Sequence, residues 1–393
     1  MKHKIIALCV FFTLAVISIT GCNIDKMNIV LKSKVNIENA KIHLNENIAK
    51  EQNADGNILK EQDINANQEI SNNQEQNIDT SQEQNINTNH EDVSDSNQEE
   101  VFKLYIKNEN EIELYSDIDE SYCLITRFSK EEWGTWNIWG WLKGSKTGNE
   151  ISIPAENTTA MVGSGTDWEY VLRVSAINKS PLYFSGGNHG NEELVDITFI
   201  KYPNEEITEL IPGQIIDIKD LKVIENTTLH INEEGIKNYA DVKREYTFRP
   251  DSIELSSTFV FKRDVFVGTS YVSMFPIKKE YGRYFKFDNI DSVYQTDPQG
   301  KTKSKPGEAY YLGKVKALST VFWGDINPEY KFRAWIKDVE MVNNFENELK
   351  TFVWDLNIYE NKLYYSKYDI KNTTVVKAGT VWKNFQGWEF IKE

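Results

Sequence analysis

The segment Ile253-Glu254-Leu255-Ser256-Ser257-Thr258-Phe259-Val260-Phe261 places large apolar side chains at alternate positions, interrupted only by the small Ser257. Side chains of a β-strand point alternately to its two faces, so this pattern predicts a strand with one buried face. A helix would instead repeat its apolar residues every three or four positions.

The same alternation recurs through the C-terminal part of the chain. It is clear in Val195–Phe199, Thr351–Ile358 and Leu363–Tyr368. Clusters of turn-forming residues separate such runs, for example Ser185–Asn188 and Asp297–Gly300. Runs of this kind, bounded by Gly, Pro, Asn and Asp, are typical of strands joined by turns.

No strand is followed regularly by an amphipathic helix, which argues against a parallel α/β sheet. We therefore predict an all-β fold over residues 101–393, an antiparallel β-sandwich of the jelly-roll-like kind. A division into two β-domains near 299–307, where polar and turn-forming residues concentrate, stays open. Short helices are expected near Asp338–Leu349 and Ser129–Trp133.

The chain is acidic, with 44 Lys and Arg against 60 Asp and Glu, a formal charge of −16 over 393 residues. Such a surface repels phosphate backbones, so nucleic acid is not an expected partner. The three cysteines, Cys9, Cys22 and Cys123, lie too far apart for a disulfide framework or a zinc cluster.

The N-terminus has the form of a secretory signal. Lys2 and Lys4 precede an apolar run from Ile5 to Ile19, which is short for a membrane span of about twenty residues. The following Ile19–Cys22 (ITGC) resembles the lipobox of bacterial lipoproteins. The resemblance implies that residues 1–21 are removed and that Cys22 carries an acyl anchor, such as palmitate, on the extracytoplasmic face of the cell membrane. A cleaved but unmodified signal, or an uncleaved helix, is the alternative.

Residues 22–100 contain no Phe, Trp or Tyr, and 23–100 hold 6 Lys against 16 Asp and Glu. A segment without large apolar side chains cannot offset the entropy lost on ordering its backbone. We therefore expect a disordered Asn/Gln/Glu-rich tether that holds the sandwich away from the membrane.

Four tryptophans fall within Trp133–Trp141. On a regular strand Trp139 and Trp141 share one face, while Trp136 and Ile138 share the other. An exposed indole face can stack against the C–H face of a sugar, which makes Trp139 and Trp141 candidate ligand-binding residues. Core packing explains the same composition equally well.

The turn Gly186–Glu192 (GGNHGNE) resembles the zinc-binding element of the aspartoacylase and metallocarboxypeptidase group. The resemblance implies that His189 and Glu192 ligate zinc, and His230 is the remaining histidine of residues 101–393 that could complete the set. That family is α/β, and its motif leads into a helix, whereas Glu193–Tyr202 alternates like a strand. No cofactor is expected unless zinc binds here.

A second hypothesis for the same region needs no metal. In architecture the predicted fold resembles polysaccharide lyases with β-jelly rolls, which use a Tyr or His base and an Arg, Asn or Gln that neutralises a uronic carboxylate. His189, Arg244 and Tyr246 are the candidate catalytic residues, with Asn188 and His230 as candidate binding residues. A histidine that merely fixes the glycine-rich turn is the plainer interpretation of His189.

Three functional hypotheses follow. The first is a membrane-anchored surface lipoprotein whose β-sandwich binds extracellular or cell-wall polysaccharide. The second is a polysaccharide lyase or other glycan-cleaving enzyme centred on His189. The third is a structural or protein-interaction module without a small ligand.

Overall fold

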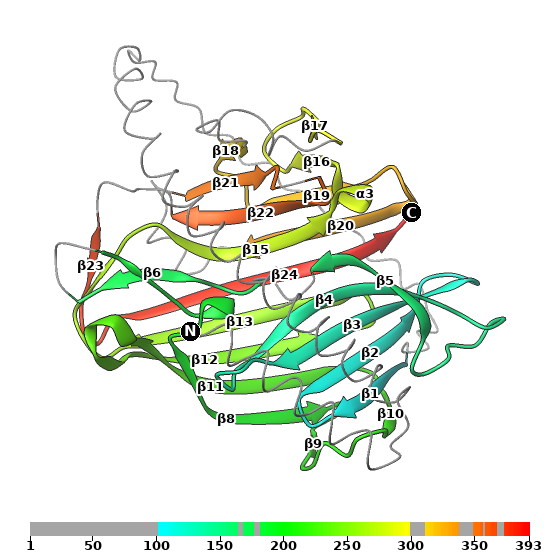
Figure 1. Ribbon diagram of the computed structural model, residues 1–393, viewed down its shortest axis with the longest axis horizontal. Helices are drawn as coiled ribbons and strands as arrows, with labels where there is room; N and C mark the ends of the chain where they lie inside the picture. The colour runs from blue at the N-terminus through cyan, green and yellow to red at the C-terminus, as the bar shows by residue number, and fades with distance from the viewer. Residues whose placement is uncertain are drawn as a thin grey trace, which may run out of the picture. The chain divides into compact units, whose positions relative to one another are not determined.

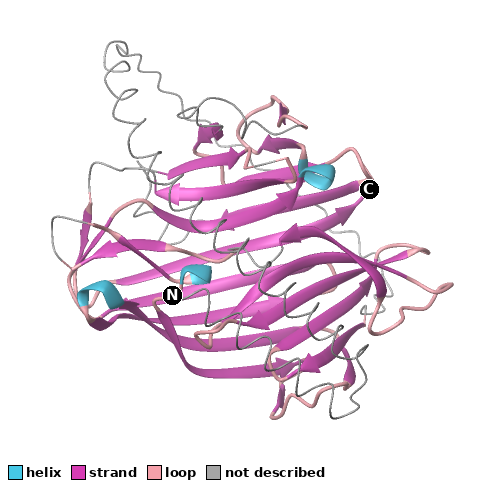
Figure 2. Cartoon of the chain, viewed as in Figure 1, coloured by secondary structure: helices cyan, strands magenta, loops and turns pink. Residues whose placement is uncertain are grey.

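The computed structural model describes residues 101–163, 168–176, 181–298, 311–337, 349–356, 358–367 and 373–393. The predicted signal, Cys22 and the tether lie outside these residues, as does the proposed division near 299–307. Figure 1 shows that the described part is built almost entirely of strands, and Figure 2 marks its few short helical turns.

The first of two large sheets has ten antiparallel strands in the order β10-β1-β2-β3-β4-β5-β15-β22-β21-β18. Their bounds are β10 Ile215–Ile218, β1 Phe102–Asn108, β2 Glu111–Asp117, β3 Tyr122–Lys130, β4 Trp136–Ser145, β5 Glu156–Gly163, β15 Ser270–Lys278, β22 Glu360–Lys367, β21 Leu349–Trp354 and β18 Tyr311–Val315.

The second large sheet also has ten antiparallel strands, in the order β17-β16-β19-β20-β24-β13-β12-β11-β8-β9. Their bounds are β17 Tyr294–Gln295, β16 Tyr284–Phe287, β19 Ser319–Trp323, β20 Tyr330–Lys337, β24 Val381–Lys392, β13 Ser252–Phe261, β12 Ile236–Phe248, β11 Leu221–Ile231, β8 Glu192–Lys201 and β9 Glu205–Ile207.

A small sheet has the order β23-β14-β6-β7. It comprises β23 Thr374–Val376, β14 Val265–Val267, β6 Leu172–Ser175 and β7 Tyr183–Ser185. The described helical elements are the 3₁₀ turns η1 Gly187–His189 and η2 Asn232–Glu234 and the short helix α3 Lys279–Gly282. None of the helices in the described part is long and apolar enough to cross a membrane.

The chain builds the sheets in two ways. Strands β1 to β5 are neighbours in chain order, and so are β11 to β13, which makes these parts meanders. From β15 onward the chain passes repeatedly between the two large sheets, as it does in jelly rolls.

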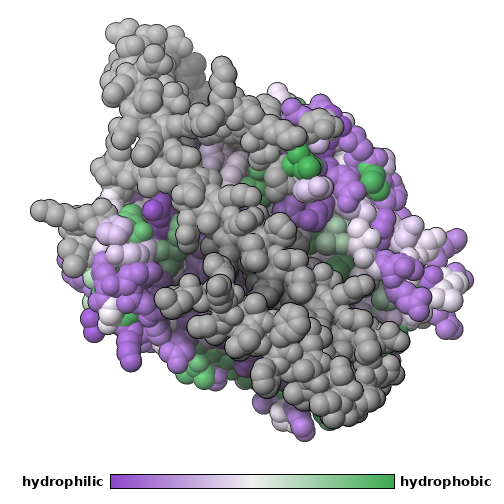
Figure 3. Space-filling model, in the orientation of Figure 1, coloured by the Kyte–Doolittle hydropathy of each residue, from purple (hydrophilic) through white to green (hydrophobic). Residues whose placement is uncertain are grey.

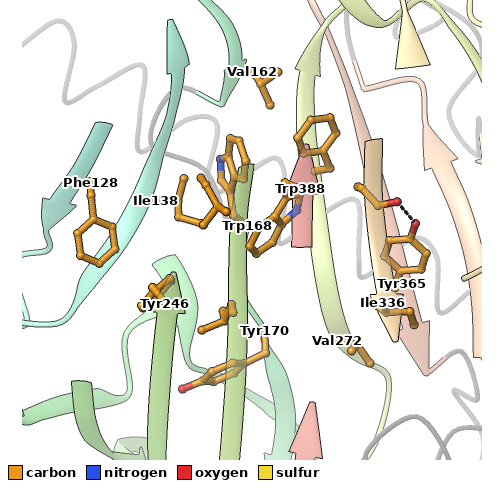
Figure 4. Packing of buried hydrophobic residues seen from close by; sticks show 14 of the residues in the cluster. Phe128, Ile138, Val162, Trp168, Tyr170, Tyr246, Val272, Ile336, Tyr365 and Trp388 are labelled. Carbon is orange, nitrogen blue, oxygen red and sulfur yellow. Dashed lines mark hydrogen bonds between the residues drawn. The ribbon is translucent and has the colours of Figure 1, made fainter. Parts of the chain in front are cut away.

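The two large sheets pack face to face around one core. Along β11 and β13, buried and partly exposed residues alternate at every position, as the period-two pattern predicted. Figure 4 shows Trp168 and Trp388 facing one another across the core, with ring centroids 5.5 Å apart at 68°. The prediction of an all-β antiparallel sandwich is confirmed.

One local expectation is wrong. Ser129 and Lys130 end β3, and the residues up to Trp133 form a turn rather than a helix. Most of the helix expected near 338–349 lies outside the described residues, and Leu349 begins β21.

Candidate functional site

A buried cluster of charged side chains lies between the two large sheets. Glu225 on β11 and Arg244 on β12 face each other in register, and both are 0% exposed. The Arg244 guanidinium forms an ion pair with the Glu225 carboxylate. The backbone N–H of Trp136, in the facing sheet, donates to the same carboxylate at 2.8 Å.

Arg244 also spans the gap between the sheets. Its Nη1 donates to Asn137 Oδ1 at 2.9 Å, and its Nη2 donates to the carbonyl of Trp136 at 3.1 Å. Tyr246, two residues along β12, donates to Glu169 Oε1 at 3.3 Å. These bonds give the two terminal nitrogens of the guanidinium and the phenol oxygen the partners that groups removed from water require, whereas Arg244 Nε has no hydrogen-bond partner among the described residues.

A third carboxylate of the cluster comes from β8. Glu192 Oε1 accepts from the Tyr170 hydroxyl and from Thr227 Oγ1, each at 2.6 Å. Figure 4 shows Tyr170 and Tyr246 within this part of the core. We call Glu169, Tyr170, Glu192, Glu225, Arg244 and Tyr246 the interior cluster.

Burial dominates the electrostatics of the interior cluster. It raises the pKa of Glu225 to about 7, although Arg244 opposes the rise. Burial also raises the pKa of Tyr170 and of Tyr246 well above the usual range. For Arg244, burial alone would lower the pKa, but the surrounding groups, Glu225 first, raise it well above its usual value. Arg244 therefore stays charged, while Glu225 titrates near neutral pH.

Polar side chains continue from this cluster across the second sheet. Arg244 lies opposite Ser257 on β13, and Ser257 lies opposite Asn384 on β24. Asn384 Nδ2 donates across the core to the carbonyl of Val272 at 3.1 Å. The row thus links the two sheets at a second point, and directional bonds of this kind help fix how the sheets face one another.

The structure places the candidate lyase residues at different depths. Asn188 in η1 meets the interior cluster indirectly, because Asn137 Nδ2 donates to its Oδ1 at 3.2 Å. The His189 ring instead stacks on Phe184, with centroids 4.3 Å apart. Arg244 and Tyr246 are both 0% exposed. A polymer cannot reach these two side chains in this arrangement.

The glycine-rich turn has a steric reason for its composition. Gly186 has φ +94°, and a Cβ there would lie 2.7 Å from the Tyr170 ring. The Gly186 N–H donates to the carbonyl of Gly190 at 2.9 Å, which closes the turn. This turn therefore packs directly against a tyrosine of the interior cluster.

The structure does not bring His189, Glu192 and His230 together as the zinc hypothesis requires. Glu192 points into the core, whereas His230 lies on the outer face of β11, near Thr228 (2.9 Å) and Glu193 (3.8 Å). Burial lowers the pKa of His230. The described residues contain no group of three His, Cys, Asp or Glu side chains placed to hold a metal ion.

The expectation that Trp139 and Trp141 share a face is also wrong. The β3–β4 pairing shifts register at this point, because Arg127 pairs with Gly140 but Phe128 pairs with Ile138. The extra residue, Trp139, turns outward. The Arg127 guanidinium lies over the Trp139 ring, with its Cζ 4.6 Å from the ring centroid. Trp141 is 0% exposed and packs on Trp168. Gly140 permits the bulge, since a Cβ there would lie 2.4 Å from a backbone oxygen.

A different aromatic surface lies on the outer face of the second sheet. Trp335 on β20 pairs with Gly387 on β24, and a Cβ on Gly387 would lie 2.4 Å from the Trp335 ring. The indole therefore lies over the backbone of the neighbouring strand. Its Nε1–H donates to Glu389 Oε1 at 2.8 Å, and Arg333 Nη2 donates to the same oxygen at 2.7 Å.

Phe385 extends this surface along β24. Its ring meets Trp335 edge-on, with centroids 5.3 Å apart at 63°. Lys337 lies opposite Phe385 in register, and Lys383 precedes it by two residues on the same face. Both lysines are exposed. We call Arg333, Trp335, Lys337, Lys383, Phe385 and Glu389 the outer patch.

A second aromatic pair lies on the same face of the sheet. Trp323 on β19 stacks with Tyr284 on β16, with centroids 6.1 Å apart at 19°. Trp335 lies opposite Ser319, so Trp323 is four residues, or about 13 Å, further along the strand. The two aromatic pairs are thus spaced to contact different units of one extended ligand.

The outer patch was missed at the sequence level, although its signal is present. Lys331–Lys337 (KFRAWIK) alternates strictly, which puts Arg333, Trp335 and Lys337 on one face. In the view of Figure 3, the described residues that can be seen are mostly hydrophilic, and the apolar ones form small separate spots.

No protein-family model matches the sequence, and neither does any curated protein. Among solved structures, the galactosidase domain of the α-galactosidase–sucrose kinase AgaSK aligns with a TM-score of 0.42 at 8% identity, covering 74% of this chain and 42% of that one. An α-galactosidase from Lactobacillus brevis gives 0.42 at 7% identity, with 73% and 40% covered.

A putative aldose 1-epimerase from Klebsiella pneumoniae gives a TM-score of 0.34 at 8% identity, covering 73% of this chain and 86% of that one. The chain spans about two fifths of the length of the galactosidase chains that it matches. At these TM-scores we take neither a family nor an activity from the similar proteins.

Proposed function

We propose that the protein is a surface lipoprotein, anchored by an acylated Cys22 on the extracytoplasmic face of the cell membrane, whose β-sandwich binds extracellular or cell-wall polysaccharide. The anchor rests on the lipobox-like Ile19–Cys22. The binding site that we propose is the outer patch.

The position of Trp335 carries the proposal. Its ring lies over Gly387, and its N–H is held by Glu389, so the indole is fixed before any ligand arrives. A rigid aromatic surface loses little conformational entropy on binding. The C–H bonds of a pyranose carry partial positive charge and are attracted to the electron-rich face of an indole.

Catalysis by the candidate lyase residues has less support. Arg244 and Tyr246 are completely buried. Both terminal nitrogens of Arg244 and the hydroxyl of Tyr246 already contact Trp136, Asn137, Glu169 or Glu225. A base and a carboxylate-neutralising residue must both touch the substrate. The outer patch instead presents its groups at the surface, which suits recognition.

The test is retention of the detergent-solubilised full chain on a panel of immobilised polysaccharides. We expect retention on at least one polymer, and loss of retention in Trp335→Ala. Trp139→Ala is the matched control, because Trp139 is a partly exposed indole on the outer face of the other sheet. Loss in Trp139→Ala but not in Trp335→Ala, or no retention on any polymer, would overturn the proposed site.

The anchor needs its own measurement. Cells that express the chain are grown with labelled palmitate, and the label is followed on the protein. We expect incorporation into the wild type and none into Cys22→Ser. Equal labelling of both proteins, or labelling of neither, would contradict the proposed anchor.

A further inference from the structure

We propose that the ligand of the outer patch is an anionic polysaccharide, with a carboxylate on its sugar rings as in uronate polymers, and that Lys337 and Lys383 bind those carboxylates. This inference rests on the proposed function and specifies its ligand class.

Two cations beside the aromatic rings lack carboxylate partners among the described residues. Lys337 lies directly opposite Phe385, with its Nζ 5.9 Å from the ring centroid. Lys383 is opposite Thr258 and two residues, about 7 Å, from Phe385 along β24. Both side chains are exposed to solvent.

Several other cations of the second sheet or its borders are paired with carboxylates. Arg333 pairs with Glu389 at 2.7 Å, and Lys286 pairs with Asp291 at 3.5 Å. Further along the sheet, Lys262 pairs with Asp241 at 2.7 Å. The net positive charge at the outer patch is therefore local to Lys337 and Lys383.

This local charge contrasts with the rest of the domain. Residues 101–393 carry 36 Lys and Arg against 44 Asp and Glu, so an anionic polymer is repelled by most of the surface. The exposed ammonium groups of Lys337 and Lys383, both next to the Phe385 ring, give an anionic polymer one site of favourable electrostatic potential. A neutral glycan would gain nothing from them.

The available hydrogen-bonding groups agree with an anion. Glu389, the carboxylate of the outer patch, already accepts from Trp335 and Arg333 through one oxygen. Lys337 and Lys383 add ammonium groups as donors at the patch, and ammonium groups bind carboxylate oxygens well.

The aromatic rings of the outer patch favour uronate polymers over polyol phosphates as ligands. Stacking on Trp335 requires a sugar ring that presents a face of axial C–H bonds, and a uronate polymer supplies such a ring and a charge in every unit. A poly(glycerol phosphate) chain has charge but no ring in its backbone. We therefore commit to a carboxylated sugar polymer.

The test compares the affinity of the detergent-solubilised full chain for polygalacturonate and for its fully methyl-esterified form, which has the same rings without charge. We expect binding to polygalacturonate at least about tenfold tighter in 50 mM salt, because each surface charge contact contributes up to about 1 kcal/mol. The preference should shrink in 0.5 M salt, where the screening length falls below about 5 Å.

The variant K337Q/K383Q should lose the preference for the charged polymer and keep its affinity for the ester. K243Q/K262Q is the matched control, since it removes two positive charges from the same face that are already paired with Glu245 and Asp241. This control should behave as the wild type.

The outcomes separate the two proposals. Equal affinity for both forms, with loss of binding in Trp335→Ala, would overturn the anionic ligand and leave polysaccharide binding intact. Tighter binding of poly(glycerol phosphate) than of polygalacturonate would replace the uronate by a phosphate polymer. Absence of binding to every polysaccharide would overturn the proposed function itself.

Discussion

Replacement of Arg244 by Met tests how the interior cluster stabilises the sandwich. The change keeps an unbranched, apolar side chain but removes the guanidinium group and its charge, so Glu225 is left buried without its ion-pair partner. Breaking one side of a buried pair costs about 3–5 kcal/mol. Because domains are stable by only about 5–15 kcal/mol, we expect R244M to lose a large fraction of its free energy of unfolding.

The free energy of unfolding that R244M loses should depend on pH. At pH 8 the wild-type Glu225 is ionised, and R244M must bury that charge alone. At pH 5.5 Glu225 is protonated, so the variant loses mainly hydrogen bonds, at a cost of about 2 kcal/mol. The difference between wild type and R244M should therefore be larger at pH 8 than at pH 5.5.

The wild type should itself show the titration of Glu225. Folding raises its pKa from 4.5 to about 7, so its contribution to stability is fully present below pH 4.5 and is lost as the pH rises through 7. The size of this contribution is on the order of 3 kcal/mol. Urea unfolding followed by tryptophan fluorescence at a series of pH values measures it.

The double variant E225Q/R244M is the control for the charge argument. It removes both members of the pair, and replacing a whole buried pair by neutral groups is often close to neutral for stability. We expect it to be more stable than R244M at pH 8. The reasoning is refuted if R244M lies within 1 kcal/mol of the wild type, or if its loss is the same at pH 5.5 and pH 8.

Three further predictions concern other parts of the molecule. Gly387→Ala should displace the Trp335 indole, because the new Cβ would lie 2.4 Å from the ring. We expect polysaccharide retention to fall at least about fivefold, while the circular dichroism spectrum stays unchanged. Full retention would contradict this prediction. Trp168→Ala removes a fully buried indole that packs on Trp388 and should cost about 3–5 kcal/mol in urea unfolding, whereas a cost under 1 kcal/mol would show that the core closes around the gap. Tyr170→Phe removes a 2.6 Å hydrogen bond to Glu192 and should cost about 1–2 kcal/mol, and an unchanged midpoint would mean that water replaces the hydroxyl.

The class of fold follows from the sequence because alternation is a local property of a strand. The segment Ile253–Phe261 alternates in burial as its sequence implies. The pairing of distant strands is not local, and the sequence contains no equivalent signal for it. That β15 lies beside β22 and β5, for example, depends on contacts across the whole sandwich.

The site was harder to predict for two physical reasons. A single bulge at Trp139 reverses the faces of the residues on either side of it, so a strictly periodic interpretation of Trp139 and Trp141 fails. Alternation also does not show which face of a strand is buried when charged residues lie on the buried face. Arg244 and Tyr246 share a face as their spacing indicates, but that face is the core.

Some signals in the sequence could have identified the interior cluster. Val223, Glu225, Thr227 and Leu229 occupy one face of β11, so the apolar residues on either side place Glu225 inward. A carboxylate at such a position requires a buried partner, and Arg244 is a charged residue at an inward position of the neighbouring strand.

The central claim is that the second sheet binds polysaccharide through its outer face. Covalent footprinting of the full chain, with and without a polygalacturonate oligosaccharide, tests it most directly. We predict that the ligand protects side chains of Lys331–Lys337 and Val381–Lys392. Protection confined to Trp136–Ser145 on the first sheet, or no protection at saturating ligand, would contradict the claim.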